Sequence, residues 1–393
     1  MTRDTKRGIV TPLVIGLVAA ALTVVYGLFE PKRVAVAYVA AYGFGVATVL
    51  GALVLLMVFH VTGALWWRAL RRVLISVAGT TPIFILLFLP IAATLALAYP
   101  WHSPVPAELD EHLRETLHHQ RAWNNPGFFL ARSFLYLGAW TLLTAYLRKA
   151  DAMHLADPSP EVVRRERQIS AVGLLVVAFT LTFASFDWLM SLQPGWSSSI
   201  FGLYVFTSGL GSALSVVAIA SHLGVRTGLL PAGIGPDHFG AIGRLMLMAV
   251  ILWTYIGFFQ LMLVWIANLP HEVGFYWARS IGSWNVANWV LFLGKFVIPF
   301  FLLLSRPLKR SPRPLAAVGV WLVLMTAVDF AWIALPSIGV RFSPLDLLPF
   351  VAVFSLTWAY GAHLAYTRGR VPERRTEFLV DPALQDALRY RSP

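Results

Sequence analysis

Cysteine is absent from the 393 residues of this sequence. Disulfide bonds, thiolate zinc sites, cysteine-ligated iron–sulfur clusters and cysteine nucleophiles are therefore excluded within the chain. Charged residues are also scarce, at 13% of the total, whereas 58% of the residues are hydrophobic and the mean hydropathy is +0.69. This balance is too apolar for a water-soluble domain, so we expect the chain to lie in a lipid bilayer.

Ten apolar runs are long enough to cross about 30 Å of hydrocarbon as helices. They lie at 9–29, 34–60, 73–98, 127–147, 169–190, 200–222, 240–267, 285–305, 315–337 and 346–366. The first run is too long for the apolar part of a signal peptide, so we expect a retained helix. Helices satisfy their own backbone hydrogen bonds in lipid, and alternating strand patterns are lacking. The sequence therefore predicts a single, all-α, polytopic membrane domain.

The positive charges are distributed unevenly between the two sides of such a domain. With the N-terminus inside, 23 of the 31 lysines and arginines lie on the side of both termini, and seven lie on the other side. This asymmetry predicts an inner-membrane protein whose termini, including the tail 368–393, are cytoplasmic. The net charge of +12 then reflects membrane topology and does not indicate nucleic-acid binding. On the opposite side, the loop 99–126 runs from acidic to basic residues, which predicts a short surface helix.

Four of the charged residues within the apolar runs stand out, because they lie inside the expected helices and not at the start of one. A charge at mid-bilayer costs about 2.5 to 3.5 kcal/mol, so such residues are usually paired or face a cavity. Lys295 and Asp329 lie about 14 to 16 Å from the same ends of their helices, which allows them to pair. Arg132 and Asp187 lie closer to that membrane edge and form a second candidate pair. Each pair is either a static ion pair or part of a proton path or quinone pocket.

Three histidines map to the cytoplasmic ends of their predicted helices: His60, His222 and His363. Arg244 opens the seventh helix on the same side. Because imidazole titrates near neutral pH, these four residues are candidates for a proton entry, with ordinary interface residues as the alternative. No helix offers a pair of well-buried histidines, which disfavours haem b, and we expect no metal site.

The stretch 186–204 is the most distinctive part of the sequence. It predicts a helical hairpin that turns at a Pro-Gly pair and returns after three serines. Aromatic side chains with a few polar groups suit a flat apolar headgroup such as a quinone, whereas a packed hairpin is the alternative. The candidate pocket residues are Asp187, Trp188, Trp196, Ser197 and Tyr204.

A weak internal repeat relates this hairpin to a later one. Asp187 and Asp329 each precede a proline by seven residues, Pro194 and Pro336, with an offset of 142. If the repeat is real, the second to fifth and the sixth to ninth helices form two similar bundles. The sequence then predicts two four-helix bundles plus two peripheral helices.

The hairpin FDWLMSLQPGWSSSIFGLYVF resembles the NrfD/PsrC-like membrane subunits of bacterial alternative complex III, a quinol:cytochrome c oxidoreductase. The larger of two such subunits carries a histidine after the tryptophan of the turn and Pro-Pro-Tyr after the phenylalanine. Here Ser197 follows Trp196, and Gly202-Leu203-Tyr204 follows Phe201. The resemblance is therefore to the second, shorter subunit.

That resemblance implies a membrane subunit with no redox cofactor of its own, in contact with lipid and with quinone or quinol as a possible ligand. Its expected partners are the larger NrfD-like sister subunit, a multihaem cytochrome c and an iron–sulfur subunit. By motif it supports only Asp187, Trp196 and Ser197 to Ser199, and the missing histidine shifts the expected role from quinol oxidation toward proton conduction or structural support. A stand-alone secondary transporter, with helices broken by prolines such as Pro82, Pro90 and Pro299, is the alternative.

Overall fold

The computed structural model describes residues 3–102, 111–156, 159–231, 233–367 and 382–391. Within these residues the regular structure consists of helices, and no strand is present. Ten helices in this part of the chain are long and apolar enough to cross a membrane. The predicted all-α, polytopic membrane fold is confirmed.

Eight of the spans are continuous helices, and two are segmented. The continuous spans are α1 (Arg3–Phe29), α2 (Pro31–Thr62), α8 (Pro126–Ala156), α9 (Pro160–Trp188), α10 (Phe201–Arg226), α11 (Pro236–Ala267), α16 (Pro312–Ala334) and α17 (Leu348–Thr367). The third span comprises η1 (Trp66–Leu70), α3 (Arg71–Ala78), α4 (Ile83–Leu87) and α5 (Leu89–Ala93), and it continues into α6 (Leu95–Ala98) and η2 (Pro100–His102). The eighth span comprises α13 (Ser283–Leu291), the π-helical η4 (Phe292–Val297) and α14 (Ile298–Leu304).

The connecting elements are short. They are α7 (Glu111–Gln120), η3 (Met190–Leu192), α12 (Pro270–Arg279), α15 (Arg306–Arg310), η5 (Leu335–Ile338), η6 (Pro344–Leu347) and α19 (Pro382–Leu388). α7 is the short helix expected in the loop 99–126.

Proline explains why the third span is segmented. Pro82 has no N–H, so it cannot donate a hydrogen bond to the carbonyl of Ala78, one helical turn earlier. The Thr81 hydroxyl and backbone N–H donate to that carbonyl instead, at 2.7 and 3.3 Å. Because a carbonyl left unpaired in the membrane is costly, these two bonds make the break tolerable.

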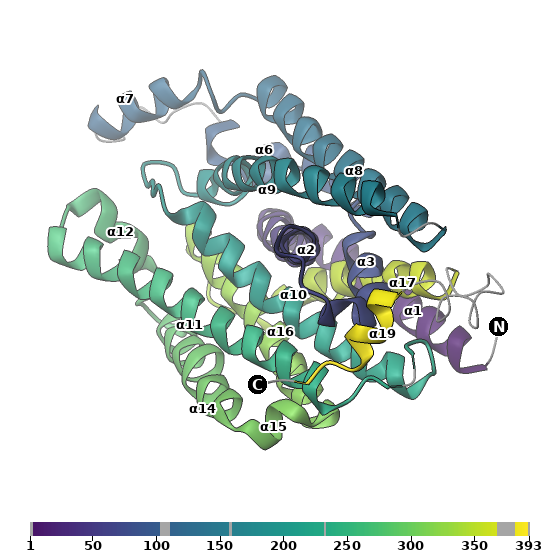
Figure 1. Ribbon diagram of the computed structural model, residues 1–393. Coiled ribbons are helices and arrows are strands. Elements are labelled where there is room, and N and C mark those ends of the chain that lie inside the picture. The colour runs from purple at the N-terminus through teal and green to yellow at the C-terminus, as the bar shows by residue number, and fades with distance from the viewer. Residues whose placement is uncertain (1–2, 103–110, 157–158, 232, 368–381, 392–393) are drawn as a thin grey trace.

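α2 lies at the centre of the molecule, between α9 on one side and α10 and α16 on the other (Figure 1). α8 packs on α9, α11 packs on α10, and α1 runs along α17. The approach of α2 to α10 is close enough that a Cβ atom added at Gly209 would lie 2.4 Å from the Ala47 carbonyl oxygen. Small residues allow such backbone contact, which provides van der Waals packing where lipid removes the hydrophobic driving force.

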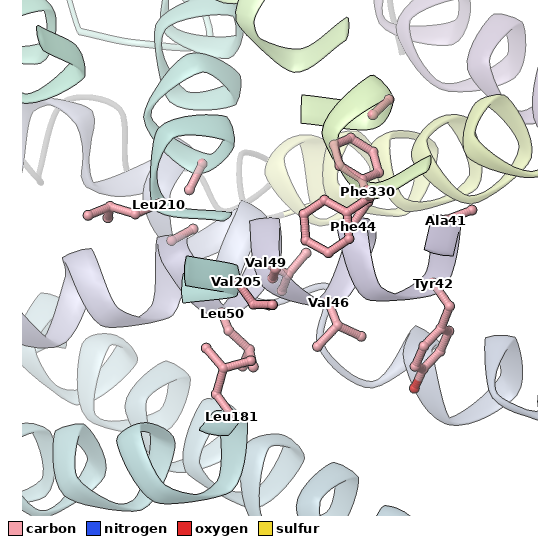
Figure 2. Close-up of a cluster of buried hydrophobic side chains, with 14 of the residues drawn as sticks. Ala41, Tyr42, Phe44, Val46, Val49, Leu50, Leu181, Val205, Leu210 and Phe330 are labelled. Carbon is pink, nitrogen blue, oxygen red and sulfur yellow. The ribbon is translucent and has the colours of Figure 1, made fainter. Parts of the chain in front are cut away.

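Around this contact, buried apolar side chains from several helices interdigitate (Figure 2). They include Phe44, Val49 and Leu50 of α2, Leu181 of α9, Val205 and Leu210 of α10, and Phe330 of α16.

The two ends of the bundle differ in the segments that they carry. The "terminal end" is where α1 begins and α17 ends, and the "hairpin end" is where the hairpin between α9 and α10 turns. At the terminal end α19 packs against η1, and the Ala387 carbonyl oxygen lies 2.8 Å from His238 Nε2. Residues 368–381 and 392–393 of the predicted tail lie outside the described residues, and the membrane side of each end stays a prediction.

Candidate functional site

An ion pair inside the bundle joins Lys295 of η4 to Asp329 of α16, with 2.5 Å between Nζ and Oδ2. The Asp329 side chain is fully buried, and Lys295 is 5% exposed. Tyr204 donates a hydrogen bond to Oδ1 at 2.5 Å, while Ser208 and Trp253 donate to Oδ2 at 2.7 and 3.2 Å. These five residues are the Asp329 cluster, and they include the pair expected from the depths of the two charges.

The cluster satisfies the charges that it buries. The carboxylate accepts four hydrogen bonds, and such charge-assisted bonds offset much of the cost of taking the ions out of water. The Lys295 ammonium also lies 4.3 Å from the centre of the Trp253 ring, close enough for a cation–π interaction. Two members, Tyr204 and Ser208, carry hydroxyls, which can each accept and donate a proton. The cluster can therefore exchange protons as well as hold an ion pair.

The π-helical turn η4 places Lys295 in this cluster. Pro299 lies four residues after Lys295 and lacks the N–H that an α-helix would direct to the Lys295 carbonyl, so a regular α-helix cannot pass this point. Trp321 of α16 donates a hydrogen bond of 2.6 Å to the Gly294 carbonyl within the widened turn. π-turns occur often at functional sites, where they change the direction of a side chain.

A cavity of about 640 Å³ adjoins the cluster toward the hairpin end. Its lining is mostly aromatic and comes chiefly from α10, α11, α12, the eighth span and α16. Tyr204 and Trp253 belong both to this lining and to the Asp329 cluster, so their rings separate the cavity from the buried carboxylate. The volume and the apolar walls with a few polar groups are typical of sites for small organic ligands.

Arg279 adds a buried positive charge to the cavity wall. It is 1% exposed, and its guanidinium donates hydrogen bonds to the carbonyls of Phe275, Trp332 and Ile333 and to the Gln193 side chain. These bonds use four of the five N–H groups. Burial lowers the pKa of Arg279 to about 9, so the group stays charged at neutral pH.

Two of the predicted pocket residues line this cavity, and three do not. Tyr204 and Trp196 contribute to the wall, where Trp196 stacks on Phe275 with 3.8 Å between ring centres. Trp188 is buried elsewhere and donates a hydrogen bond to the Ser133 hydroxyl. Ser197 is exposed in the hairpin turn. The hairpin therefore contributes one face of the pocket, and α11 and α12 supply aromatic residues that the motif did not indicate.

The fifth predicted pocket residue, Asp187, forms a second ion pair with Arg132. The guanidinium donates two hydrogen bonds, Nε to Oδ2 at 2.9 Å and Nη2 to Oδ1 at 2.8 Å. Trp123 and Tyr136 donate one further bond each, at 2.9 Å. The guanidinium also lies 4.1 Å from the ring centres of Trp123 and Phe128. The expected pair is thus present, and Asp187 does not line the 640 Å³ cavity.

The four residues considered for a proton entry do not converge. His60 lies in α2, where its Nδ1 is 2.8 Å from the Ser170 hydroxyl. His222 is partly buried near the end of α10, and His363 is exposed on α17. Arg244 is exposed and donates a hydrogen bond to the Tyr390 hydroxyl. No described contact joins these side chains to one another or to the Asp329 cluster.

The prediction missed a buried charge network near the terminal end. Arg71 of α3 forms an ion pair with Asp151 of α8 and lies 3.7 Å from Glu166 of α9. The other Glu166 oxygen lies 3.2 Å from His154 Nδ1. The fourth predicted run ended at 147 and the fifth began at 169, so Asp151, His154 and Glu166 were assigned to a loop by their low hydropathy. The opposite charges of this segment were the signal that could have indicated the network, since paired charges allow α8 and α9 to extend further.

No cluster of three or more histidine, aspartate or glutamate side chains in the described ranges has the arrangement of a metal site. No protein-family model matches the sequence, and no curated protein matches it either.

Proposed function

We propose that this chain is a membrane subunit of a quinol:cytochrome c oxidoreductase of the alternative complex III type, and that the Asp329 cluster exchanges protons with a quinone headgroup in the adjacent cavity. The observation that carries this proposal is the position of Tyr204. Its hydroxyl donates to the buried Asp329 carboxylate at 2.5 Å, and its ring forms part of the cavity wall. One residue thus connects a ligand-sized space to a buried ionisable pair.

The cavity suits a quinone because of its shape and its single charge. Aromatic walls such as the stacked Trp196 and Phe275 favour a flat ring. Arg279 is positively charged, and its described partners are carbonyl oxygens. A carbonyl or quinolate oxygen of a headgroup is the kind of acceptor that the remaining Arg279 N–H would stabilise.

Proton exchange in this arrangement needs no additional reactant. When a quinol hydroxyl gives a proton to the Tyr204 oxygen, Tyr204 passes its own proton to the Asp329 carboxylate, and the hydroxyl is regenerated. Once it is protonated, Asp329 no longer compensates the charge of the Lys295 ammonium. This uncompensated buried charge favours release of the proton from Asp329. The electrons would go to haem c and iron–sulfur centres of partner subunits, which the hairpin resemblance implies.

A stand-alone secondary transporter is the second candidate. The segmented third span and the π-turn of the eighth span favour it, because transporters bind substrates where helices are interrupted. These interruptions occupy different positions in the two sets of four helices that the internal repeat predicts. The transporter hypothesis therefore has less support than the quinone-linked one.

To test this proposal, the protein is purified from native membranes in mild detergent. Co-purifying subunits are then identified by mass spectrometry, and haem absorbance is measured in a visible spectrum. We expect a multihaem cytochrome c, an iron–sulfur subunit and a larger sister subunit to co-purify, with haem absorbance. A colourless chain purified without these subunits would contradict the oxidoreductase assignment and favour the transporter.

A further inference from the structure

A second, smaller cavity lies toward the terminal end of the bundle. It has a volume of about 120 Å³ and is bounded by α2, α3, α10 and α17, with Gly8 of α1 at its rim. Its lining reaches from Thr227 and Tyr366, near the ends of α10 and α17, to Thr48 near the middle of α2. The space therefore extends from one end of the bundle to about half its depth.

The walls of this cavity carry hydroxyl groups that lack partners among the described residues. Ser76 Oγ and Thr357 Oγ1 are buried, and neither forms a hydrogen bond there, although both residues line the space. Buried polar groups are almost always satisfied by protein or by ordered water. A cavity of this size has room for several waters, whereas an acyl chain would offer these hydroxyls no partner.

Side-chain hydroxyls lie between the inner end of this cavity and the Asp329 cluster. Thr48 lines the cavity, and its oxygen lies 2.8 Å from the Ser212 oxygen of α10. Ser212 follows Ser208 by four residues, so both lie on the same face of α10, one turn apart. Ser208 donates to the Asp329 carboxylate and accepts from Lys295.

We propose that the terminal-end cavity holds a water chain and that protons pass between it and Asp329 through Thr48, Ser212 and Ser208. The proposal rests on the proton-exchange function proposed above and names the route on the other side of the cluster. Each hydroxyl or water accepts a proton from the preceding group and releases its own proton to the next group, so no other reactant is consumed. None of His60, His222, Arg244 and His363 lines this cavity, so the entry lies elsewhere than the histidines suggested.

Water access to the cavity can be tested by thiol labelling, which needs no redox activity. The wild-type chain has no cysteine, so only an introduced thiol in this chain can react. Single cysteines are introduced as S76C, which faces the cavity, and as A78C, a buried residue of the same helix that does not line it. The assembled protein in membrane vesicles is treated from the terminal side with a small charged methanethiosulfonate reagent, and labelling of this chain is measured by mass spectrometry.

We expect S76C to react at least about tenfold faster than A78C, because a thiol reacts as the solvated thiolate. Equally slow labelling of both variants would contradict a hydrated cavity. Labelling of S76C by an uncharged maleimide alone would mean that an acyl chain fills the space, and this result would also overturn the proposal.

The route itself is tested at Thr48. T48V keeps the shape of the side chain and removes the hydroxyl, whereas T48S keeps the hydroxyl and is the matched control. In the complex reconstituted into vesicles, T48V should lower the number of protons moved per electron, while T48S should retain it and uncoupled electron transfer should continue in both. An unchanged ratio in T48V would exclude this hydroxyl route while leaving the oxidoreductase assignment in place, whereas failure of the partner subunits to co-purify would contradict that assignment.

Discussion

The Asp329 carboxylate accepts hydrogen bonds from Lys295, Tyr204, Ser208 and Trp253 inside the bundle. Such a group is stable only while its charge is matched, since desolvation of an unpaired ion costs several kcal/mol. Its partner Tyr204 lines the 640 Å³ cavity, whereas neither Asp187 nor its hydroxyl partner Tyr136 does, and the Arg132–Asp187 pair is held by a rigid guanidinium fork. This contrast is why we assign proton exchange to the first pair.

The first prediction concerns the mutual dependence of Lys295 and Asp329. K295M alone leaves the Asp329 charge buried without its cation, so we expect a loss of about 3 to 5 kcal/mol. The double variant K295M/D329L removes both charges and should lose less, because no uncompensated ion remains. Thermal unfolding of the purified complex measures both. Equal losses would mean that the two residues do not stabilise each other.

A second prediction concerns the geometry of Arg132. R132K keeps the positive charge but cannot form the two parallel bonds to Asp187 or stack on Trp123 and Phe128. We expect a loss of about 1.5 to 3 kcal/mol in stability. The proton-to-electron ratio should stay at the wild-type value. Wild-type stability in R132K would show that only the charge matters at this site.

At the scale of elements, α10 carries Tyr204, Ser208 and Ser212 on one helix, so its position against α2 fixes the proposed route. Gly209 lies between these residues and contacts the α2 backbone. A side chain there would force the helices apart and separate Thr48 from Ser212.

The third prediction follows from that contact. G209A places a Cβ atom 2.4 Å from the Ala47 carbonyl oxygen, and we expect destabilisation of at least roughly 1 to 3 kcal/mol from overpacking. G211A on the same helix is the matched control, because its nearest neighbour would be the Ala249 Cβ atom at 3.8 Å. The yield and melting temperature of the folded protein measure both. Similar stability of the two variants would contradict the tight α2–α10 contact.

Hydropathy predicted the ten spans because lipid imposes length and apolarity on any crossing helix. The prolines indicated interruptions in the third span, through Pro82, and in the eighth span, through Pro299. They did not indicate that the second interruption takes the form of a π-turn, since the widening depends on how Pro299, Gly294 and Trp321 meet in three dimensions. Hydropathy did not indicate α12, which is partly polar and lies between two spans.

The candidate site was predictable only in part for a related reason. Depth along a helix can be counted from the sequence, so Lys295 was matched with Asp329 and Arg132 with Asp187. The sequence does not show how each helix is rotated about its own axis relative to its neighbours, because loops separate them. Ser208 and Trp253 were therefore not recognised as partners. Arg279 was counted as a loop charge, and its burial depends on carbonyls supplied by α12 and by the end of α16.

At the scale of the whole molecule, two cavities lie toward opposite ends of the bundle, with the Asp329 cluster between them. The cavity toward the hairpin end is large and aromatic, whereas the one toward the terminal end is smaller and has unpartnered hydroxyls in its wall. Such an arrangement can link a redox ligand on one side to proton movement on the other. The membrane side of each end is predicted from the excess of positive charge around the termini.

The most direct test of this account is the proton-to-electron ratio of the complex carrying D329N, reconstituted into vesicles. Asparagine keeps the size of the side chain and can still accept hydrogen bonds, but it cannot take up a proton at neutral pH. We predict that the ratio falls while the subunits remain assembled, and that D187N, the control in the other pair, keeps the wild-type ratio. An unchanged ratio in D329N would contradict a role for the cluster in proton transfer.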